Sequence, residues 1–214
     1  VVMSLAKMCA SAGVDYMLRN IARGDASGRE VGDGSLAAYY TASGYPPGVW
    51  LGSGLAGLAD GRGIGSGTLV NEAAMRLLFG EAKDPVTGAQ LGRAPSSSSR
   101  PVVGFDLTFS VPKSVSVLWG VSGPEIKAVI ERAHHDAIGA ALRLVERDVA
   151  RTRIGAGGSV QVPVRGIIAA GFDHFDSRDG DPQLHTHFTV ANRVQAADGI
   201  WRTLYGARLY RAVV

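Results

Sequence analysis

The sequence predicts an α+β fold in which a largely antiparallel sheet is covered by helices. Apolar and polar residues alternate with a period of two in segments 105–111 and 183–194, which is typical of strands with one buried face. The stretch 123–152 instead has the apolar spacing of a long helix. Strands and helices follow one another without the regular β–α–β alternation of a parallel sheet, which favours antiparallel pairing.

Composition limits the chain to one domain and excludes several classes of protein. The 214 residues are 46% apolar, enough for a single core, and 19% charged with a formal net charge of +3. Arginine far outnumbers lysine, which suits phosphate-bearing partners, although this net charge alone is a weak indicator. The single cysteine, Cys9, excludes a disulfide framework and a CxxC zinc site and fits a cytoplasmic protein. Apolar runs stay well below the ~20 residues that a membrane span needs.

The N-terminal part is expected to contain one strand and two short helices. Residues 3–9 are typical of a strand, and 12–23 have helical spacing that leaves Tyr16 off the apolar stripe. A polar, glycine-rich loop follows at 24–35, and 35–43 is expected to form a second helix.

The middle of the chain alternates between regular and turn-rich segments. Residues 69–82 predict a helix stopped by Gly80. Residues 83–101 are rich in turn formers and serine, which predicts a flexible surface loop within the domain. The strand at 105–111 has one apolar and one polar face and ends at Pro112.

The C-terminal part predicts a long helix followed by a hairpin. Pro124 lies near the start of the helix at 123–152, where proline is tolerated. Residues 159–175 predict one or two strands, and turn residues at 177–182 lead into the strand at 183–194.

Three histidines fall where this hairpin would bring them together. Residues two apart in a strand share a face, so His185 and His187 point the same way. Across the turn, a constant position sum sets His174 opposite His185 or His187, on their face. Three converging imidazoles with open coordination positions indicate a catalytic metal site, and the alternative is three hydrogen-bonded histidines without a metal.

These residues carry a resemblance to a known family. The segment "HFD…DPQLHTHFTVAN", which begins at His174, resembles the metal motif of conjugative relaxases of the MobF family of HUH endonucleases. The segment "GFDLTFSVPKSVSVLW" looks like that family's second motif, whose aspartate maps onto Asp106. Residues 39–58, "YYTASGYPPGVWLGSGLAGL", are similar to its tyrosine-plus-W-x-G-x-G segment, so the resemblance covers most of the chain.

The resemblance implies the relaxase palm fold and a DNA-nicking transesterase. A tyrosine near the N-terminus would attack one phosphodiester of single-stranded DNA at a plasmid or integrative-element transfer origin. The products would be a 5′-phosphotyrosyl adduct and a free 3′-hydroxyl, which the same site can rejoin. The three histidines would hold a divalent cation. Mg or Mn is usual in the family, although imidazoles also suit Zn or Ni. Asp106 would orient a metal histidine or help to activate the tyrosine.

The sequence departs from the family pattern in its tyrosines. Relatives commonly carry two tyrosine pairs with the nucleophile in the first, whereas here the first site has only Tyr16. Tyr16 is the expected nucleophile, and the later pair Tyr39 and Tyr40 is the second choice. Relatives also continue into further helices and often a helicase, so residues 1–214 are expected to be a single relaxase domain, truncated at its C-terminal end and without the helicase.

The implied partners are single-stranded origin DNA, an adjacent DNA hairpin, relaxosome accessory proteins and a type IV coupling protein, without membrane insertion. The implied location is the bacterial cytoplasm, with transfer into the recipient cell. Lys113 and Arg193 are candidate contacts to the DNA backbone. Two alternative functions stay open: a three-histidine phosphodiesterase that activates water, and an inactive module that binds origin DNA.

Overall fold

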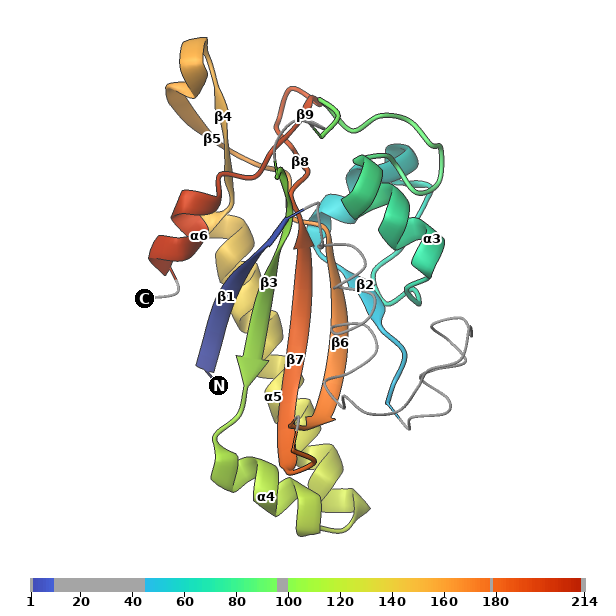
Figure 1. The fold of residues 1–214 in the computed structure, drawn as a ribbon, viewed down its shortest axis with the longest axis vertical. Coiled ribbons are helices and arrows are strands. Elements are labelled where there is room, and N and C mark those ends of the chain that lie inside the picture. The colour runs from blue at the N-terminus through green and yellow to red at the C-terminus, as the bar shows by residue number, and fades with distance from the viewer. Residues whose placement is uncertain (1, 10–44, 96–99, 178, 213–214) are drawn as a thin grey trace.

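A five-stranded antiparallel sheet forms the centre of the computed structural model, which describes residues 2–9, 45–95, 100–177 and 179–212. The spatial order is β1-β3-β7-β6-β2, and every neighbouring pair is antiparallel (Figure 1). The α+β prediction is therefore confirmed. The strands are β1 (Val2–Cys9), β2 (Val49–Leu51), β3 (Val102–Ser110), β6 (Ala169–Asp176) and β7 (Pro182–Ala191).

Four α-helices and two small ribbons accompany the sheet in the described part of the chain. The helices are α3 (Glu72–Met75), α4 (Lys113–Val121), α5 (Pro124–Leu144) and α6 (Gly206–Ala212), with π-helical turns extending α3 to Glu81 and α5 to Val149. The ribbons are β4 (Arg151–Ile154) with β5 (Val160–Pro163), and β8 (Val194–Gln195) with β9 (Trp201–Arg202); short 3-10 segments lie at Ser53–Gly61 and Ala156–Gly158. None of these helices combines the length and apolar content that crossing a membrane requires.

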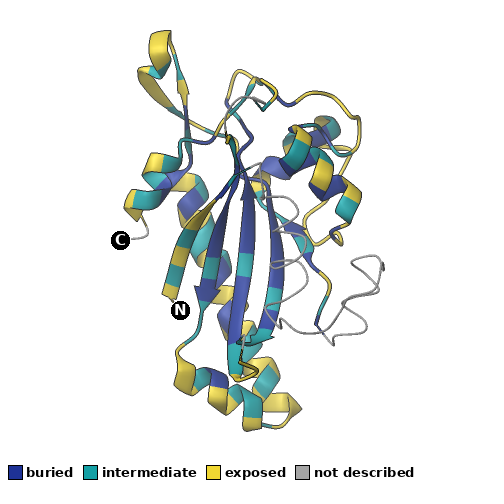
Figure 2. Ribbon diagram, in the orientation of Figure 1, coloured by how far each residue is buried: buried dark blue, intermediate teal, exposed yellow. Residues whose placement is uncertain are grey.

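The face of the sheet that packs against α5, called the α5 face here, holds one of two apolar clusters. Alternation along β3 places Phe105, Leu107 and Phe109 on this face, where they meet Ile138 of α5 and Phe188 of β7. Figure 1 shows α5 running behind the strands, and Figure 2 shows that the inner strands are the most buried part of the molecule. The predicted two-faced strand at 105–111 is confirmed.

The opposite face is called the histidine face here. At one end of it, the helix α3 and the 3-10 segment cover an apolar cluster that includes Trp50, Met75, Phe79 and Phe172. At the other end, near the β6–β7 turn, the same face carries polar side chains from β3, β6 and β7. The helices therefore leave a polar surface beside a dry core, and this arrangement positions the site.

The helix predicted at 69–82 exists, but its ends are set differently. Asn71 caps its first turn, because the side-chain oxygen accepts a hydrogen bond from the Ala74 N–H. The helix continues through Gly80 and ends at Glu81, and the next residue, Ala82, adopts a left-handed conformation with φ of 54°. The expectation that Gly80 stops the helix is thus wrong, because the final π-helical turn includes it.

Part of the range predicted to be a flexible loop is tied to the body of the protein. Asp84 is buried and accepts backbone N–H groups from Ala59, Val86 and Thr87. Leu91 is also buried, with its N–H donating to the carbonyl of Ala82. The flexibility predicted for 83–101 stays a prediction.

Three further expectations need adjustment at their edges. The long helix ends at Val149 and not at 152, because β4 begins at Arg151. Segment 159–175 forms two strands, β5 and β6, and the strand after the turn ends at Ala191. Helix α4 has no counterpart in the prediction, since its alternating Val and Ser residues do not give a clear helical stripe. The helices expected at 12–23 and 35–43 lie outside the described residues.

Candidate metal centre

The β6–β7 hairpin brings His174, His185 and His187 together on the histidine face. His174 pairs directly with His185, and His187 follows two positions along the same strand. The three ring centroids are 5.0–5.2 Å apart, and one nitrogen from each ring lies within 4.8 Å of the other two. The sequence prediction that these rings converge is confirmed by this geometry.

Two of the rings are held by hydrogen bonds at Nδ1. In His187, Nδ1 lies 2.8 Å from Asp106 Oδ2, and in His185 it lies 2.8 Å from the carbonyl oxygen of Gln183. Each oxygen accepts, so the proton resides on Nδ1 and the lone pair on Nε2. This is the arrangement in which a neutral imidazole serves as a metal ligand. The donor set therefore fits one divalent cation held by three nitrogens, with its remaining positions open.

Asp106 stands beside the three rings, on β3. It shares the histidine face with Thr108, whose register partner is His187. Its Oδ2 accepts hydrogen bonds from His187 and from the Thr108 hydroxyl at 3.2 Å. Its Oδ1 is buried and has no hydrogen-bond partner among the described residues. The carboxylate thus orients one ring and keeps one acceptor available.

A second polar network lies behind the cluster, on the α5 face. Thr186, between the two histidines of β7, donates its hydroxyl proton to Asp173 Oδ1 at 2.6 Å. His134 Nε2 lies 2.9 Å from the same hydroxyl, and His135 Nε2 lies 2.9 Å from Asp173 Oδ2. Helix α5 is therefore fixed to both strands of the hairpin directly behind the metal-binding side.

The pKa values in this network follow from burial and hydrogen bonding. Burial, together with the neighbouring charge of His135, lowers the pKa of His134 to about 4. The hydrogen bond to Asp173 raises the pKa of His135. Burial works to raise the pKa of Asp173, but its hydrogen bonds from His135 and Thr186 outweigh burial and lower it. A neutral His134 and an ionised Asp173 are the resulting states near neutral pH.

Sequence reasoning missed this network and one aromatic contact. His134 and His135 are adjacent on a helix and gave no sign of a shared partner, although alternation in the strands placed Asp173 and Thr186 on one face. The Tyr45 ring packs against His174 with centroids 5.6 Å apart, and its hydroxyl donates to Asp176.

The remaining predicted residues are placed as follows. Lys113 begins α4 and is half exposed, with Nζ 3.7 Å from Asp181 in the β6–β7 turn. Arg193 is only 7% exposed, and its guanidinium donates to two backbone carbonyls; its contact to DNA stays a prediction. Tyr16, Tyr39 and Tyr40 lie outside the described residues.

Comparison with known proteins shows the family of the chain. The TrwC relaxase family model matches residues 10–214. The chain is 40% identical over 156 residues to the multifunctional conjugation protein TraI of Escherichia coli, a match that covers 72% of this chain and 8% of TraI. The chain thus spans a small fraction of the length of the curated relatives it matches.

Solved structures of the TrwC relaxase share the fold of this chain. The conjugative relaxase TrwC in complex with oriT DNA, in a copper-bound form, superposes with a TM-score of 0.74 at 27% identity, covering 99% of this chain and 64% of the chain in that structure. A metal-bound TrwC complex with oriT DNA gives 0.71 at 26% identity over the same shares. With the family model spanning nearly all of its residues, the chain belongs to the TrwC relaxase family, and the resemblance to MobF relaxases seen in its sequence is confirmed.

Proposed function

We propose that this chain is a relaxase domain that nicks single-stranded DNA at a transfer origin by metal-assisted tyrosine transesterification. The observation that carries the proposal is the convergence of three histidines on one sheet face, with Asp106 hydrogen-bonded to His187. Family membership supplies the reaction class, because TraI is a conjugation protein and TrwC is a relaxase by name.

The proposed substrate follows from the relatives. TrwC has been solved with oriT DNA, including a 27-mer that comprises a recognition hairpin and the cleavage site. We therefore expect this chain to bind single-stranded origin DNA with an adjacent hairpin. Relaxosome accessory proteins, a coupling protein of type IV secretion, a cytoplasmic location and transfer with the DNA complete the proposal by family analogy.

The proposed nucleophile is Tyr16, with Tyr39 and Tyr40 as second choices. The phenolic oxygen would form a bond to phosphorus while the bond from phosphorus to the 3′ oxygen breaks. The strand then ends in a 3′-hydroxyl, and its 5′ phosphate is esterified to the protein. The ester conserves the bond, so the reverse attack by the 3′-hydroxyl rejoins the strand.

A phenol with a pKa near 10 needs help to lose its proton at neutral pH. Asp106 is the proposed acceptor, because its Oδ1 is buried beside the histidines and has no partner among the described residues. Its other oxygen would keep the His187 ring in its ligating orientation. Asp106 would thereby serve both the ring and the tyrosine.

The proposed cofactor is a divalent cation held by His174, His185 and His187. When bound, it would supply a Lewis acid that offsets charge on the non-bridging oxygens of the attacked phosphate. Neutral imidazoles would leave the full charge of the cation available for that purpose. Mg or Mn is proposed as the working ion, although three nitrogen donors also accept Zn, Ni or Cu.

The proposed DNA contact is Lys113, which lies at the same end of the sheet as the histidines. It is exposed, and its ion pair with Asp181 is a loose surface contact that a phosphate could replace.

The test is formation of an SDS-resistant protein–DNA adduct with a single-stranded origin oligonucleotide and Mn²⁺. Adduct should form with the wild type and be lost with a chelator, in His185→Ala and in Tyr16→Phe, while Tyr39→Phe and Tyr40→Phe retain it. Circular dichroism of each variant controls for folding.

The outcomes separate the competing functions. A water-activating phosphodiesterase would cleave the oligonucleotide without an adduct and keep its activity in Tyr16→Phe. An inactive binding module would retain the oligonucleotide without cleaving it. Adduct formation by all three tyrosine variants would refute tyrosine attack as proposed here.

A further inference from the structure

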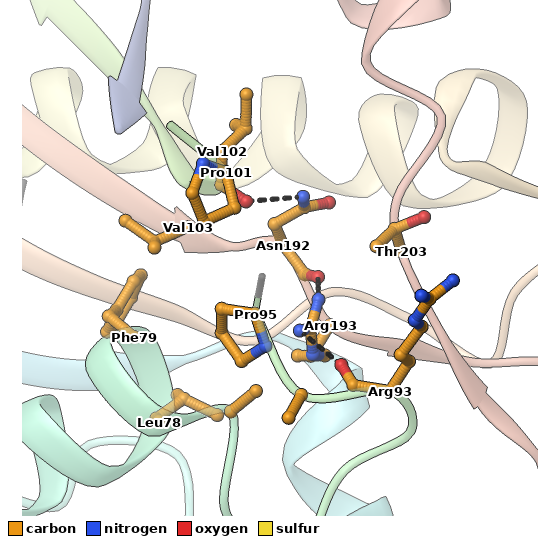
Figure 3. Close-up of a pocket in the computed structure, with 12 residues that line it drawn as sticks. Leu78, Phe79, Arg93, Pro95, Pro101, Val102, Val103, Asn192, Arg193 and Thr203 are labelled. Carbon is orange, nitrogen blue, oxygen red and sulfur yellow. Dashed lines mark hydrogen bonds between the residues drawn. The ribbon is translucent and has the colours of Figure 1, made fainter. Parts of the chain in front are cut away.

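A cavity of about 340 Å³ opens at the end of β3 and β7 that lies away from the β6–β7 turn (Figure 3). One wall is apolar and includes Leu78, Phe79, Pro95 and Pro101. The other wall is formed by Arg93, Arg193 and Thr203. Phe79 belongs to the apolar cluster on the histidine face, so the cavity and the metal centre share one side of the sheet.

Arg193 is the unusual member of the lining. It is 7% exposed, and its Nη1 and Nη2 donate to the backbone carbonyls of Asn192 and Arg93 at 2.7 and 2.9 Å. Its Nε is buried without a partner among the described residues. Both acceptors are neutral, so hydrogen bonds position the guanidinium but do not neutralise it.

Nothing in the described lining of the cavity compensates this charge. None of the twelve lining residues is acidic, and a second arginine, Arg93, extends toward Thr203 at the rim. The Asn192 side chain is engaged elsewhere, with the Val102 carbonyl and the Leu204 N–H. Burial lowers the pKa of Arg193, as expected for a cation removed from water. A buried cation without a carboxylate is costly, and an anion in the cavity would offset that cost.

The chemistry of the two walls identifies the kind of anion. A guanidinium presents parallel N–H donors that match a phosphate, and the apolar wall offers carbon atoms against which a base can pack. The volume is in the range of sites for small organic ligands. We propose that this cavity binds a nucleotide, with its phosphate at Arg193 and Arg93 and its base against Leu78, Phe79, Pro95 and Pro101.

Two sources share this chemistry: a nucleotide of the DNA strand and a free mononucleotide. The first rests on the proposed function, because the strand would need to reach both sites. Four residues of β7 lead from His187 to Ala191, roughly 13 Å at the rise of a strand, and Arg193 follows two residues later, after a bend at Asn192.

The test uses metal-free protein, so that no cation at the histidines attracts phosphate. Calorimetric titrations with dAMP and with deoxyadenosine compare the wild type with Arg93→Gln and Arg193→Gln. Arg62→Gln is the matched control, because that side chain is 83% exposed, outside the cavity lining, and loses the same charge. Affinity for a short single-stranded oligonucleotide is measured on the same variants over a range of salt.

We expect dAMP to bind at least about tenfold more tightly than deoxyadenosine, and both cavity variants to lose about tenfold in dAMP affinity. If the nucleotide belongs to the strand, oligonucleotide affinity falls as well, and the salt dependence becomes shallower by about 0.7 in log–log slope. If only dAMP affinity falls, the site takes a free nucleotide. If a thermal melt shows that Arg193→Gln is unfolded, the dAMP affinity of Arg93→Gln alone tests the proposal.

The proposal is overturned if dAMP does not bind, or if Arg93→Gln binds both probes as Arg62→Gln does. Neither titration needs Tyr16 or a bound metal. A failure here therefore leaves the adduct assay unaffected, and a failed adduct assay leaves the dAMP result standing.

Discussion

Replacing Thr186 with valine tests whether the network behind the metal centre stabilises the hairpin. Thr186 is 2% exposed, donates its hydroxyl proton to Asp173 at 2.6 Å and lies 2.9 Å from His134 Nε2. Valine has nearly the same shape, so it leaves no cavity but removes both hydrogen bonds. His134 is buried and the Asp173 side chain is only 20% exposed, so water replaces the lost hydroxyl poorly.

The expected loss can be worked from these two contacts. A hydrogen bond to a charged carboxylate contributes about 1.5–3 kcal/mol, and one between neutral groups about 1 kcal/mol. Together they give a loss of about 3 kcal/mol in the free energy of unfolding. For a chain of this length that is a fall in Tm of roughly 6–12 °C.

Urea denaturation followed by circular dichroism measures the loss, with Thr186→Ser as the matched control. Serine keeps the hydroxyl and loses one methyl group, so it should cost only about 1 kcal/mol. If the valine variant unfolds at the same urea concentration as the serine variant, the hydroxyl contributes nothing and the reasoning from the network is refuted.

Three further predictions concern acid, the metal and the core. His134 has a native pKa of about 4 against about 6.5 when unfolded, so the unfolded state takes up the proton first and stability falls as pH drops between these values. We expect His134→Gln to remove about 2 kcal/mol of the loss between pH 6.5 and 4.5 in urea titrations; an unchanged pH profile would contradict this. Asp106→Asn should weaken Mn²⁺ binding by about 10- to 100-fold in calorimetry, because the neutral amide holds the His187 ring less firmly; wild-type affinity would show that the carboxylate is not needed. Leu107→Ala should cost about 3 kcal/mol in unfolding free energy, because the side chain is fully buried against α5; a cost below about 1 kcal/mol would mean that this core is not as described.

The pairing of the β6–β7 hairpin can be predicted from local sequence patterns. A period of two fixes which residues of a strand share a face, and turn residues at 177–182 fix where two strands pair. From these alone, His174 falls opposite His185 or His187, and the structure has the first of these two registers. The prediction succeeded because both rules act over fewer than about twenty residues and need no knowledge of the rest of the chain.

The network behind the cluster could not be obtained in the same way. His134 and His135 reach Thr186 and Asp173 only because α5 packs on the sheet with one particular rotation about its axis. That rotation is set by apolar packing around Ile138, whose partners come from β3 and β7. Helix periodicity gives the apolar stripe but not the polar partner on the facing element.

The burial of Arg193 is a second feature that local sequence patterns do not predict. In the sequence it is one basic residue after a strand, and an exposed position is the usual expectation for arginine. In the structure its guanidinium is enclosed, because the loop carrying Arg93 and Pro95 lies across it. Contacts between segments 100 residues apart decide its role.

The sequence by itself determined the long strands of the sheet, the meeting of three imidazoles and the family, because these depend on local periodicity and on a motif read in order. Only the tertiary structure decided which histidine Asp106 orients, that Thr186 joins the hairpin to α5 and that Arg193 is enclosed. The physical reason is that hydrogen bonds and burial between distant segments depend on how whole elements pack, and no short window of residues contains that information.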